Sequence, residues 1–267
     1  MKKIIIISIW VILIVGLIAG LIFSGIFHQN RTCKAVEIDI NYASADPFFT
    51  AEDINSFLIQ KNDSIKGKKI SEINENLIEN IIKENPYIID ADVFTTMDGI
   101  LKINITQRKA IVRIINKMNQ QFYLDNLGVK MPINNKYPAN VVIATGNINA
   151  YYSLFSPSDL NQRDDTLNLM KDSIFYGIYK VADYISKNMF LKAQIEQIYM
   201  NENSEIELIP KLGEQIIIFG NAENIEEKFN KLLIIYKEAF NKLGWDKYKL
   251  INLTYENQVV CTKNILK

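Results

Sequence analysis

Residues 85–110 read NPYIIDADVFTTMDGILKINITQRKA, and this stretch decides the fold of the segment around it. Apolar side chains alternate with other residues from Ile89 to Thr95 and again from Leu101 to Ile105, the period-two pattern of half-buried strands. Asp98-Gly99 lies between the two runs and is typical of a tight turn. The stretch therefore predicts a β-hairpin.

The residues upstream of this hairpin predict one strand followed by two helices. Residues 35–42 alternate apolar and polar side chains, which indicates a half-buried strand. Thr50-Ala-Glu-Asp53 is a capping box, whose side chains satisfy free amides at the start of a helix. The second helix follows the turn at 66–69, and its apolar stripe comprises Ile73, Leu77, Ile78, Ile81 and Ile82. The order β-α-α-β-β over residues 34–110 predicts a small α+β domain with two helices on one face of a short sheet.

Residues 111–267 predict a larger mixed α/β domain with an antiparallel sheet. Its expected strands lie at 122–124, 129–131, 141–144, 194–200, 205–209 and 215–219. One expected helix carries an apolar stripe that comprises Leu167, Met170, Ile174, Ile178, Val181 and Ile185. A second helix is expected to be capped by Asn221 and to end at Gly244.

The last stretch, residues 250–263, reads LINLTYENQVVCTK and predicts one further strand. One of its faces presents Ile251, Leu253, Tyr255, Val259 and Cys261, and the other presents Asn252, Thr254, Glu256, Gln258 and Val260. Because it is the last strand of the sequence, we expect it at an edge of the sheet, where its backbone groups are open to a partner.

The N-terminal segment predicts a membrane anchor. Residues 4–27 run without a charge, and at 1.5 Å per residue they form roughly 36 Å of helix, enough to cross a hydrocarbon core of about 30 Å. Lys2 and Lys3 precede the run, so residues 1–3 are expected in the cytoplasm and the rest outside it, in the periplasm. The alternative is a cleaved signal peptide, but the run exceeds the usual apolar core and no Ala-x-Ala site follows.

The composition argues against several classes of function. With 30 Lys+Arg against 30 Asp+Glu, no strongly basic surface is available, so nucleic acid is not an expected partner. His28 is the single histidine, and Cys33 and Cys261 lie far apart, so neither a His/Cys metal site nor a Ser-His-Asp or Cys-His centre is expected. Asp164-Asp165 and Glu226-Glu227 are adjacent pairs, which do not converge on one bond as glycosidase carboxylates must. We expect a protein that is not an enzyme, without cofactor, metal or small-molecule substrate, although carboxylates distant in sequence can still meet in a fold.

The layout resembles the FtsQ/DivIB family of bacterial cell-division proteins over essentially the whole chain. In that family a membrane helix precedes a POTRA domain and a larger β domain. The matching segments are Asn85-Pro-Tyr-Ile88, Ala91-Asp-Val93, Gly99-Ile-Leu101, Gln107-Arg-Lys-Ala110, Phe122-Tyr-Leu-Asp125 through Gly128, Met131-Pro132 and Ile251-Asn-Leu-Thr-Tyr255. Gln107 stands where the family usually has Glu, and Ala110 where Pro and Ala alternate. The richness in Asn, Ile, Lys and Tyr looks closest to members from Bacteroidota.

This resemblance implies a scaffold that links early and late division proteins at the septum of the inner membrane. It implies binding of FtsB- and FtsL-like partners, with strand addition at the terminal strand. The residues expected to contact the partner are Trp245, Asn252, Thr254, Tyr255, Glu256, Gln258 and Val260. The alternative is a POTRA-containing component of a protein-translocation or envelope-assembly machine, although such proteins usually repeat the POTRA unit or end in a long series of barrel strands.

Overall fold

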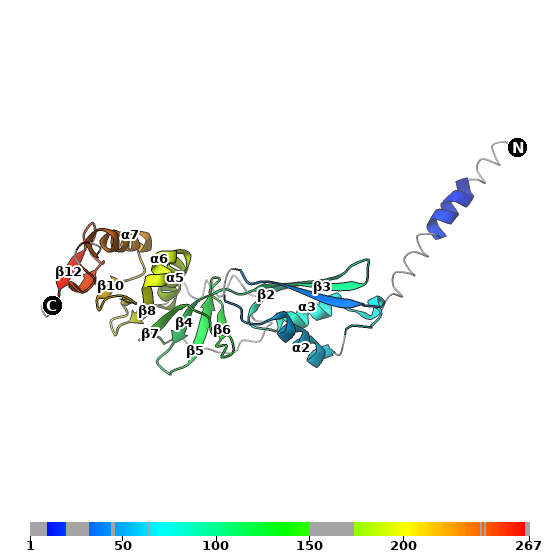
Figure 1. Cartoon of the computed structure of the whole chain (residues 1–267), viewed down its shortest axis with the longest axis horizontal. Helices are drawn as coiled ribbons and strands as arrows, with labels where there is room; N and C mark the ends of the chain where they lie inside the picture. Colours follow the sequence, from blue (N-terminus) through cyan, green and yellow to red (C-terminus); the bar gives the residue numbers. More distant parts are fainter. Residues whose placement is uncertain are drawn as a thin grey trace. The chain divides into compact units, whose positions relative to one another are not determined.

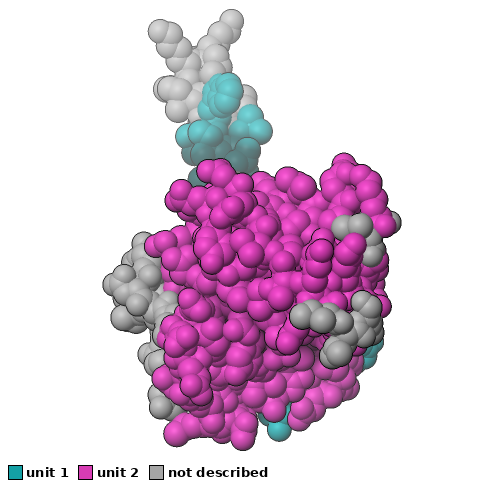
Figure 2. All heavy atoms as spheres, turned by 90° about the vertical axis from the view of Figure 1, so that its left-hand side faces the viewer, with its two compact units in different colours: residues 1–41, 49–107 teal, residues 42–48, 108–267 magenta. Residues whose placement is uncertain are grey.

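The computed structural model describes residues 10–19, 32–43, 46–62, 65–149, 174–240, 242 and 244–264 (Figure 1). These residues fall into two compact units, residues 1–41 with 49–107 and residues 42–48 with 108–267 (Figure 2). Within the predicted anchor, residues 10–19 are helical and exposed, and the other positions of 4–27 lie outside the described residues. Among the described helices, none has the length and apolar character that a membrane crossing requires.

The first unit has the predicted element order β-α-α-β-β. Its elements are β1 (Ala35–Asn41), α2 (Ala51–Asn62), a 3₁₀ turn (Ile70–Glu72), α3 (Glu75–Lys83), β2 (Ile88–Thr95) and β3 (Ile100–Gln107). The strands form a sheet of order β1-β3-β2, in which β1 runs parallel and β2 antiparallel to the central β3. Both β1 and β2 are therefore edge strands.

Local side chains cap the starts of the two helices in this unit, and the first of these caps is the one that the sequence predicts. The Asp53 N–H donates to Thr50 Oγ1 at 3.3 Å, and the Thr50 N–H donates to Asp53 Oδ2 at 2.9 Å, which completes the capping box of α2. Asn74 caps α3 in the same way, accepting from the Leu77 N–H at 3.0 Å. In the stripe of α3, Ile78 and Ile82 are buried, whereas the Leu77 side chain is 47% exposed.

The second unit is built on one mixed sheet. Its strands are β4 (Ala110–Ile115), β5 (Gln121–Asp125), β6 (Lys130–Pro132), β7 (Val142–Gly146), β8 (Ile195–Met200), β9 (Ile206–Pro210), β10 (Ile216–Gly220), β11 (Tyr248–Asn252) and β12 (Val260–Lys263). Among the described residues the sheet has the order β12-β11-β10-β9-β8-β7-β4-β5-β6. Parallel pairs join β4 to β7, β7 to β8 and β10 to β11, so the sheet is not purely antiparallel.

The helices of this unit bury their apolar stripes in one core with the strands. They are α5 (Ile174–Lys187), α6 (Met189–Gln194) and α7 (Ile225–Ile235), and α7 continues as a π-helical turn (Tyr236–Phe240). Ile178, Val181 and Ile185 of α5 are buried in the core cluster as predicted, whereas Leu167 and Met170 lie outside the described residues. The Phe229 ring of α7 stacks on Tyr184 with centroids 4.7 Å apart. Burial of these helices against the sheet supplies the main stabilisation of this unit.

Two predictions for this unit are wrong. Asn221 does not cap α7, which begins at Ile225 after Asn224; Asn221 Oδ1 accepts instead from Lys228 Nζ at 2.9 Å. The stretch 250–263 is not one strand but parts of two, β11 and β12, joined by a turn. The turn begins where Asn252 Oδ1 accepts from the Thr254 N–H at 2.9 Å and passes Asn257 at a φ of 55°. Asn and Thr suit the polar face of a strand, but they also form such turns, so alternation alone did not reveal the break.

Candidate functional site

The C-terminal hairpin forms one edge of the large sheet. β11 pairs in parallel with β10 on one side and antiparallel with β12 on the other, so β12 is the edge strand. Opposite pairs are Asn252 with Val260 and Ile251 with Cys261. The predicted edge position thus belongs to residues 260–263, while β11 lies between two strands.

Two hydrogen bonds show which backbone groups of β12 point away from the sheet. The Leu253 N–H donates to Ile218 O at 2.9 Å, so the odd-numbered residues at the end of β11 face β10 and the even-numbered ones face β12. The Asn264 N–H donates to Lys247 O at 2.9 Å, so the even-numbered residues of β12 face β11. Both bonds lead to the same alternation. Cys261 and Lys263 therefore direct their N–H and C=O groups to the open side.

The opposite edge of the same sheet is closed to strand addition at one position. The Asp125 N–H donates to Val129 O at 3.0 Å, which places Met131 toward β5 and Pro132 toward the outside by the same alternation. Proline has no N–H to donate, and it is found on edge strands with this orientation. The β6 edge therefore lacks the donor at Pro132, whereas both outward-facing residues of β12 have an N–H.

Six of the seven predicted contact residues belong to the C-terminal hairpin, where they fall into three groups. Val260 is the first residue of β12, and its side chain is 44% exposed on the face opposite Cys261. Asn252 ends β11 and orders the turn through its side chain. The remaining residues of the turn, Thr254, Tyr255, Glu256 and Gln258, are exposed.

The turn is tied to the core by a lysine of α7. Lys231 Nζ donates to Tyr255 O at 2.7 Å and to Leu253 O at 3.2 Å, and it forms an ion pair with Glu227 at 3.2 Å. The Tyr255 side chain itself remains 48% exposed. This arrangement holds the backbone of the turn in place while leaving the tyrosine ring available to a partner.

Trp245 does not belong with this group. Its ring lies 5.2 Å from that of Phe240 and 5.5 Å from that of Tyr236 between centroids, so it packs against the core. The prediction also omitted Cys261 and Lys263, whose backbones face outward. No local pattern identifies them, because the alternation of outward-facing groups depends on the pairing of β11 with β10.

In the described structure, the Cys261 thiol and the carboxylate pairs considered from the sequence lie on separate elements. Burial raises the pKa of the Cys261 thiol, which disfavours a reactive thiolate. Of the two carboxylate pairs considered from the sequence, Glu226 and Glu227 lie in the first turn of α7, and Asp164-Asp165 lies outside the described residues. Within the described ranges no group of three or more His, Cys, Asp or Glu side chains is placed to hold a metal ion.

Comparison with known proteins identifies both units. Residues 31–106 match the POTRA-like domain, and residues 109–262 match the family described as FtsQ/DivIB, C-terminal related. A search of curated proteins returned no match. The second match covers more than half of the chain and includes the C-terminal hairpin up to Thr262, one residue before the end of β12. The chain therefore belongs to the FtsQ/DivIB family of cell-division proteins.

Proposed function

We propose that this protein is a non-enzymatic scaffold of the division machinery that binds FtsB- and FtsL-like partners by strand addition to β12. The observation that carries the proposal is the outward-facing backbone of Cys261 and Lys263 at the edge of the large sheet. An added strand satisfies such groups without any catalytic side chain. Family membership supports the role in cell division, and the apolar residues 4–27 would hold the protein at the inner membrane of the septum.

The backbone alone offers limited affinity. Two outward-facing residues provide up to four hydrogen bonds, and at a net 0.5 to 1.5 kcal/mol each they contribute about 2 to 6 kcal/mol before the costs of association. Micromolar binding needs about 8 kcal/mol in all, so side chains must contribute. Val260 on the outer face and Tyr255 in the turn are suitably exposed for this purpose.

A matched pair of proline variants tests the docking edge. Cys261→Pro removes a donor that faces outward, so we expect loss of partner binding with a melting temperature within a few degrees of the wild type. Thr262→Pro removes a donor that faces β11, so we expect it to destabilise the hairpin of the protein itself. Cys261→Ala controls for the loss of the thiol and should bind the partner normally.

The measurement is co-purification of the full chain, in detergent micelles, with the FtsB- and FtsL-like proteins of the same organism. Thermal unfolding followed by circular dichroism reports the fold of each variant. If Cys261→Pro retains wild-type binding, β12 is not the docking edge. If these partners do not co-purify with the wild type after crosslinking of the cell envelope, the proposed scaffold role is wrong.

A further inference from the structure

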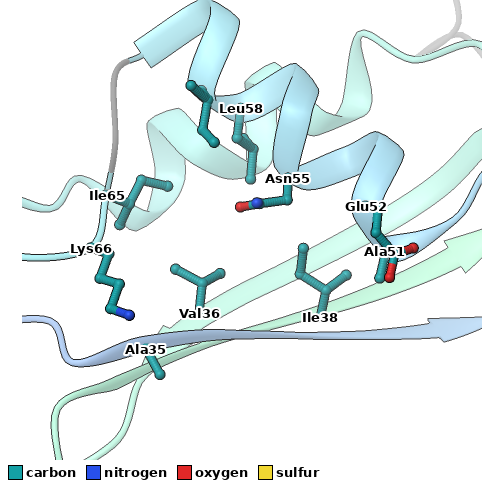
Figure 3. A pocket seen from close by; sticks show the side chains of 10 residues that line it. Ala35, Val36, Ile38, Ala51, Glu52, Asn55, Leu58, Ile65 and Lys66 are labelled. Atoms are coloured by element: carbon teal, nitrogen blue, oxygen red, sulfur yellow. The ribbon is translucent and has the colours of Figure 1, made fainter.

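The first unit contains an apolar groove between β1 and α2 (Figure 3). Its volume is about 520 Å³, within the range of sites that bind ligands. The apolar residues that line it are Ala35, Val36, Ile38, Ala51, Leu58, Ile59 and Ile65. The Ile59 side chain is 51% exposed, so part of this apolar surface is open to solvent.

Three polar side chains border the groove without partners of their own. Lys66 lies at the end beside Ala35, Glu52 at the end beside Ile38, and Asn55 between them (Figure 3). None of the three forms a hydrogen bond or ion pair with another residue in the described part of the chain. The groove thus has a positive end, a negative end and a free amide above its apolar floor.

The groove runs along the open edge of the small sheet. Backbone pairing already occurs on this side of β1 at its beginning, where the Cys33 N–H donates to Lys68 O at 2.8 Å and the Gly67 N–H donates to Cys33 O at 2.9 Å. These bonds end before Ala35. The Lys34 N–H donates to Gly99 O at 2.8 Å, so by alternation Ala35, Glu37 and Asp39 face outward; of these, Ala35 O accepts from Cys33 Sγ at 3.4 Å.

The other edge of this sheet is protected by α3. Glu79 Oε1 accepts from the Val93 N–H at 3.0 Å, and Glu75 Oε1 accepts from the Thr95 N–H at 2.7 Å. These carboxylates occupy outward-facing donors of β2, so a strand added there would have to displace them. The β1 edge is therefore the better acceptor of a further strand.

We propose that the β1–α2 groove binds an extended segment of a partner protein as a fourth strand next to β1. The segment carries an acidic side chain opposite Lys66, a basic side chain opposite Glu52 and an apolar side chain between them. Ala35 and Ile38 are three residues apart, roughly 10 Å, so charges at positions i and i+4 of an extended chain, about 13 Å apart, reach both ends. This site is separate from β12 and does not depend on the function proposed above.

The charges decide the direction in which the segment binds. A strand parallel to β1 presents its acidic residue first, and an antiparallel strand presents its basic residue first. Two fluorescent peptides, Thr-Glu-Thr-Val-Thr-Lys-Thr and Thr-Lys-Thr-Val-Thr-Glu-Thr, distinguish these cases by anisotropy with the full chain in detergent micelles. We expect one peptide to bind at least about tenfold more tightly than the other.

Variants of the groove complete the test. The double variant Glu52→Lys/Lys66→Glu should invert the preference between the two peptides, and Asn55→Trp, at an exposed position of α2, should fill the groove and abolish binding of both. The matched controls Gln60→Lys and Lys69→Glu change charge outside the groove lining and should leave binding unchanged. A peptide with N-methyl groups at alternate amides should bind at least about tenfold more weakly, because it cannot complete the ladder.

Three results would overturn the proposal. The first is equal binding of the two peptides to the wild type, and the second is an unchanged preference in the double variant. The third is self-association of the full chain that Asn55→Trp removes, which would assign the groove to a second copy. Circular dichroism of each variant must show the wild-type spectrum for its binding result to count against the proposal. If the double variant misfolds, Glu52→Gln/Lys66→Gln replaces it; this variant should bind the two peptides equally, and a preference that persists in it would overturn the proposal.

Discussion

Replacement of Arg108 by methionine is expected to destabilise the second unit in a manner that depends on pH. Arg108 Nη1 donates to Asp125 Oδ2 at 2.8 Å, and the two side chains are only 4% and 0% exposed. Asp125 Oδ1 also accepts from the N–H groups of Leu127 at 2.9 Å and Val129 at 2.7 Å, so this carboxylate orders the turn between β5 and β6. Arg108→Met leaves that carboxylate buried without its cation.

The size of the effect follows from the two states open to Asp125. If the carboxylate stays ionised, loss of one partner of a buried pair costs about 3 to 5 kcal/mol. If Asp125 takes up a proton instead, the free energy of unfolding falls by about 1.4 kcal/mol for each unit by which the pH exceeds 3.8, the ordinary pKa of this side chain. That is about 5 kcal/mol at pH 7.5 and about 3 kcal/mol at pH 6. We therefore expect a loss of about 3 to 5 kcal/mol at pH 7.5.

The sign of the pH dependence follows from the direction of the pKa shift. Burial raises the pKa of Asp125 in the folded protein, although Arg108 opposes this effect. A carboxyl whose pKa is raised on folding contributes most stability below its unfolded pKa and loses that contribution as the pH rises through its folded pKa. Removal of Arg108 raises the pKa further, so the difference between variant and wild type should widen from pH 4.5 to pH 7.5.

The assay is urea unfolding followed by the fluorescence of Trp245, which packs in the core of the same unit. The double variant Arg108→Met/Asp125→Asn keeps an oxygen acceptor for the turn and removes the buried charge, so it should recover most of the lost stability and show little dependence on pH. A loss below about 1 kcal/mol for Arg108→Met, equal at both pH values, would refute the reasoning.

Three further changes test other parts of the fold. Gly220→Ala places a Cβ 2.8 Å from Thr254 Cγ2 at a φ of +75°. Because Thr254 lies in the turn that leads to β12, this variant should weaken co-purification of the partner. Gly67→Ala, at a φ of +92° with nothing within 4 Å of the added Cβ, should cost only the backbone strain and should leave partner binding normal. Equal binding by both variants would contradict this account. Burial raises the pKa of Tyr236 to about 12, so the free energy of unfolding should fall by up to about 3 kcal/mol between pH 10 and 12. Tyr236→Phe should lack that part of the fall in urea titrations. If the free energy of unfolding of Tyr236→Phe falls as much between pH 10 and 12 as that of the wild type, this explanation is wrong. Thr50→Ala removes the cap of α2 and should lower stability by about 1 kcal/mol in thermal unfolding, whereas Thr50→Ser should retain it.

Features of the fold that depend on short-range patterns were predictable from the sequence. The capping box at Thr50 and the hairpin at Asp98-Gly99 use contacts within a few residues, and both are confirmed. The apolar stripe of α5 is confirmed at Ile178, Val181 and Ile185. The turn at Asn252 uses equally local contacts, but its residues also fit a strand, so the pattern is compatible both with one continuous strand and with a turn between two strands.

The candidate site depended on contacts between distant parts of the chain. Pairing of 216–218 with 250–252 places β11 inside the sheet and directs the next strand to the edge. The open groove of the first unit likewise depends on how α2 packs over β1, and no local pattern reveals that Glu52 and Asn55 of α2 and Lys66 beyond its end lie around it.

The sequence by itself determined the element order of the first unit and the family of the chain, because periodicity, caps and turn residues act over a few neighbouring positions. In the second unit it did not reveal β4, α6 or the division of 250–263 into two strands. Only the tertiary structure decided which strand closes the large sheet and which backbone groups face outward. A strand directs successive N–H groups to opposite sides, so a shift of one residue in a distant pairing reverses which ones are open.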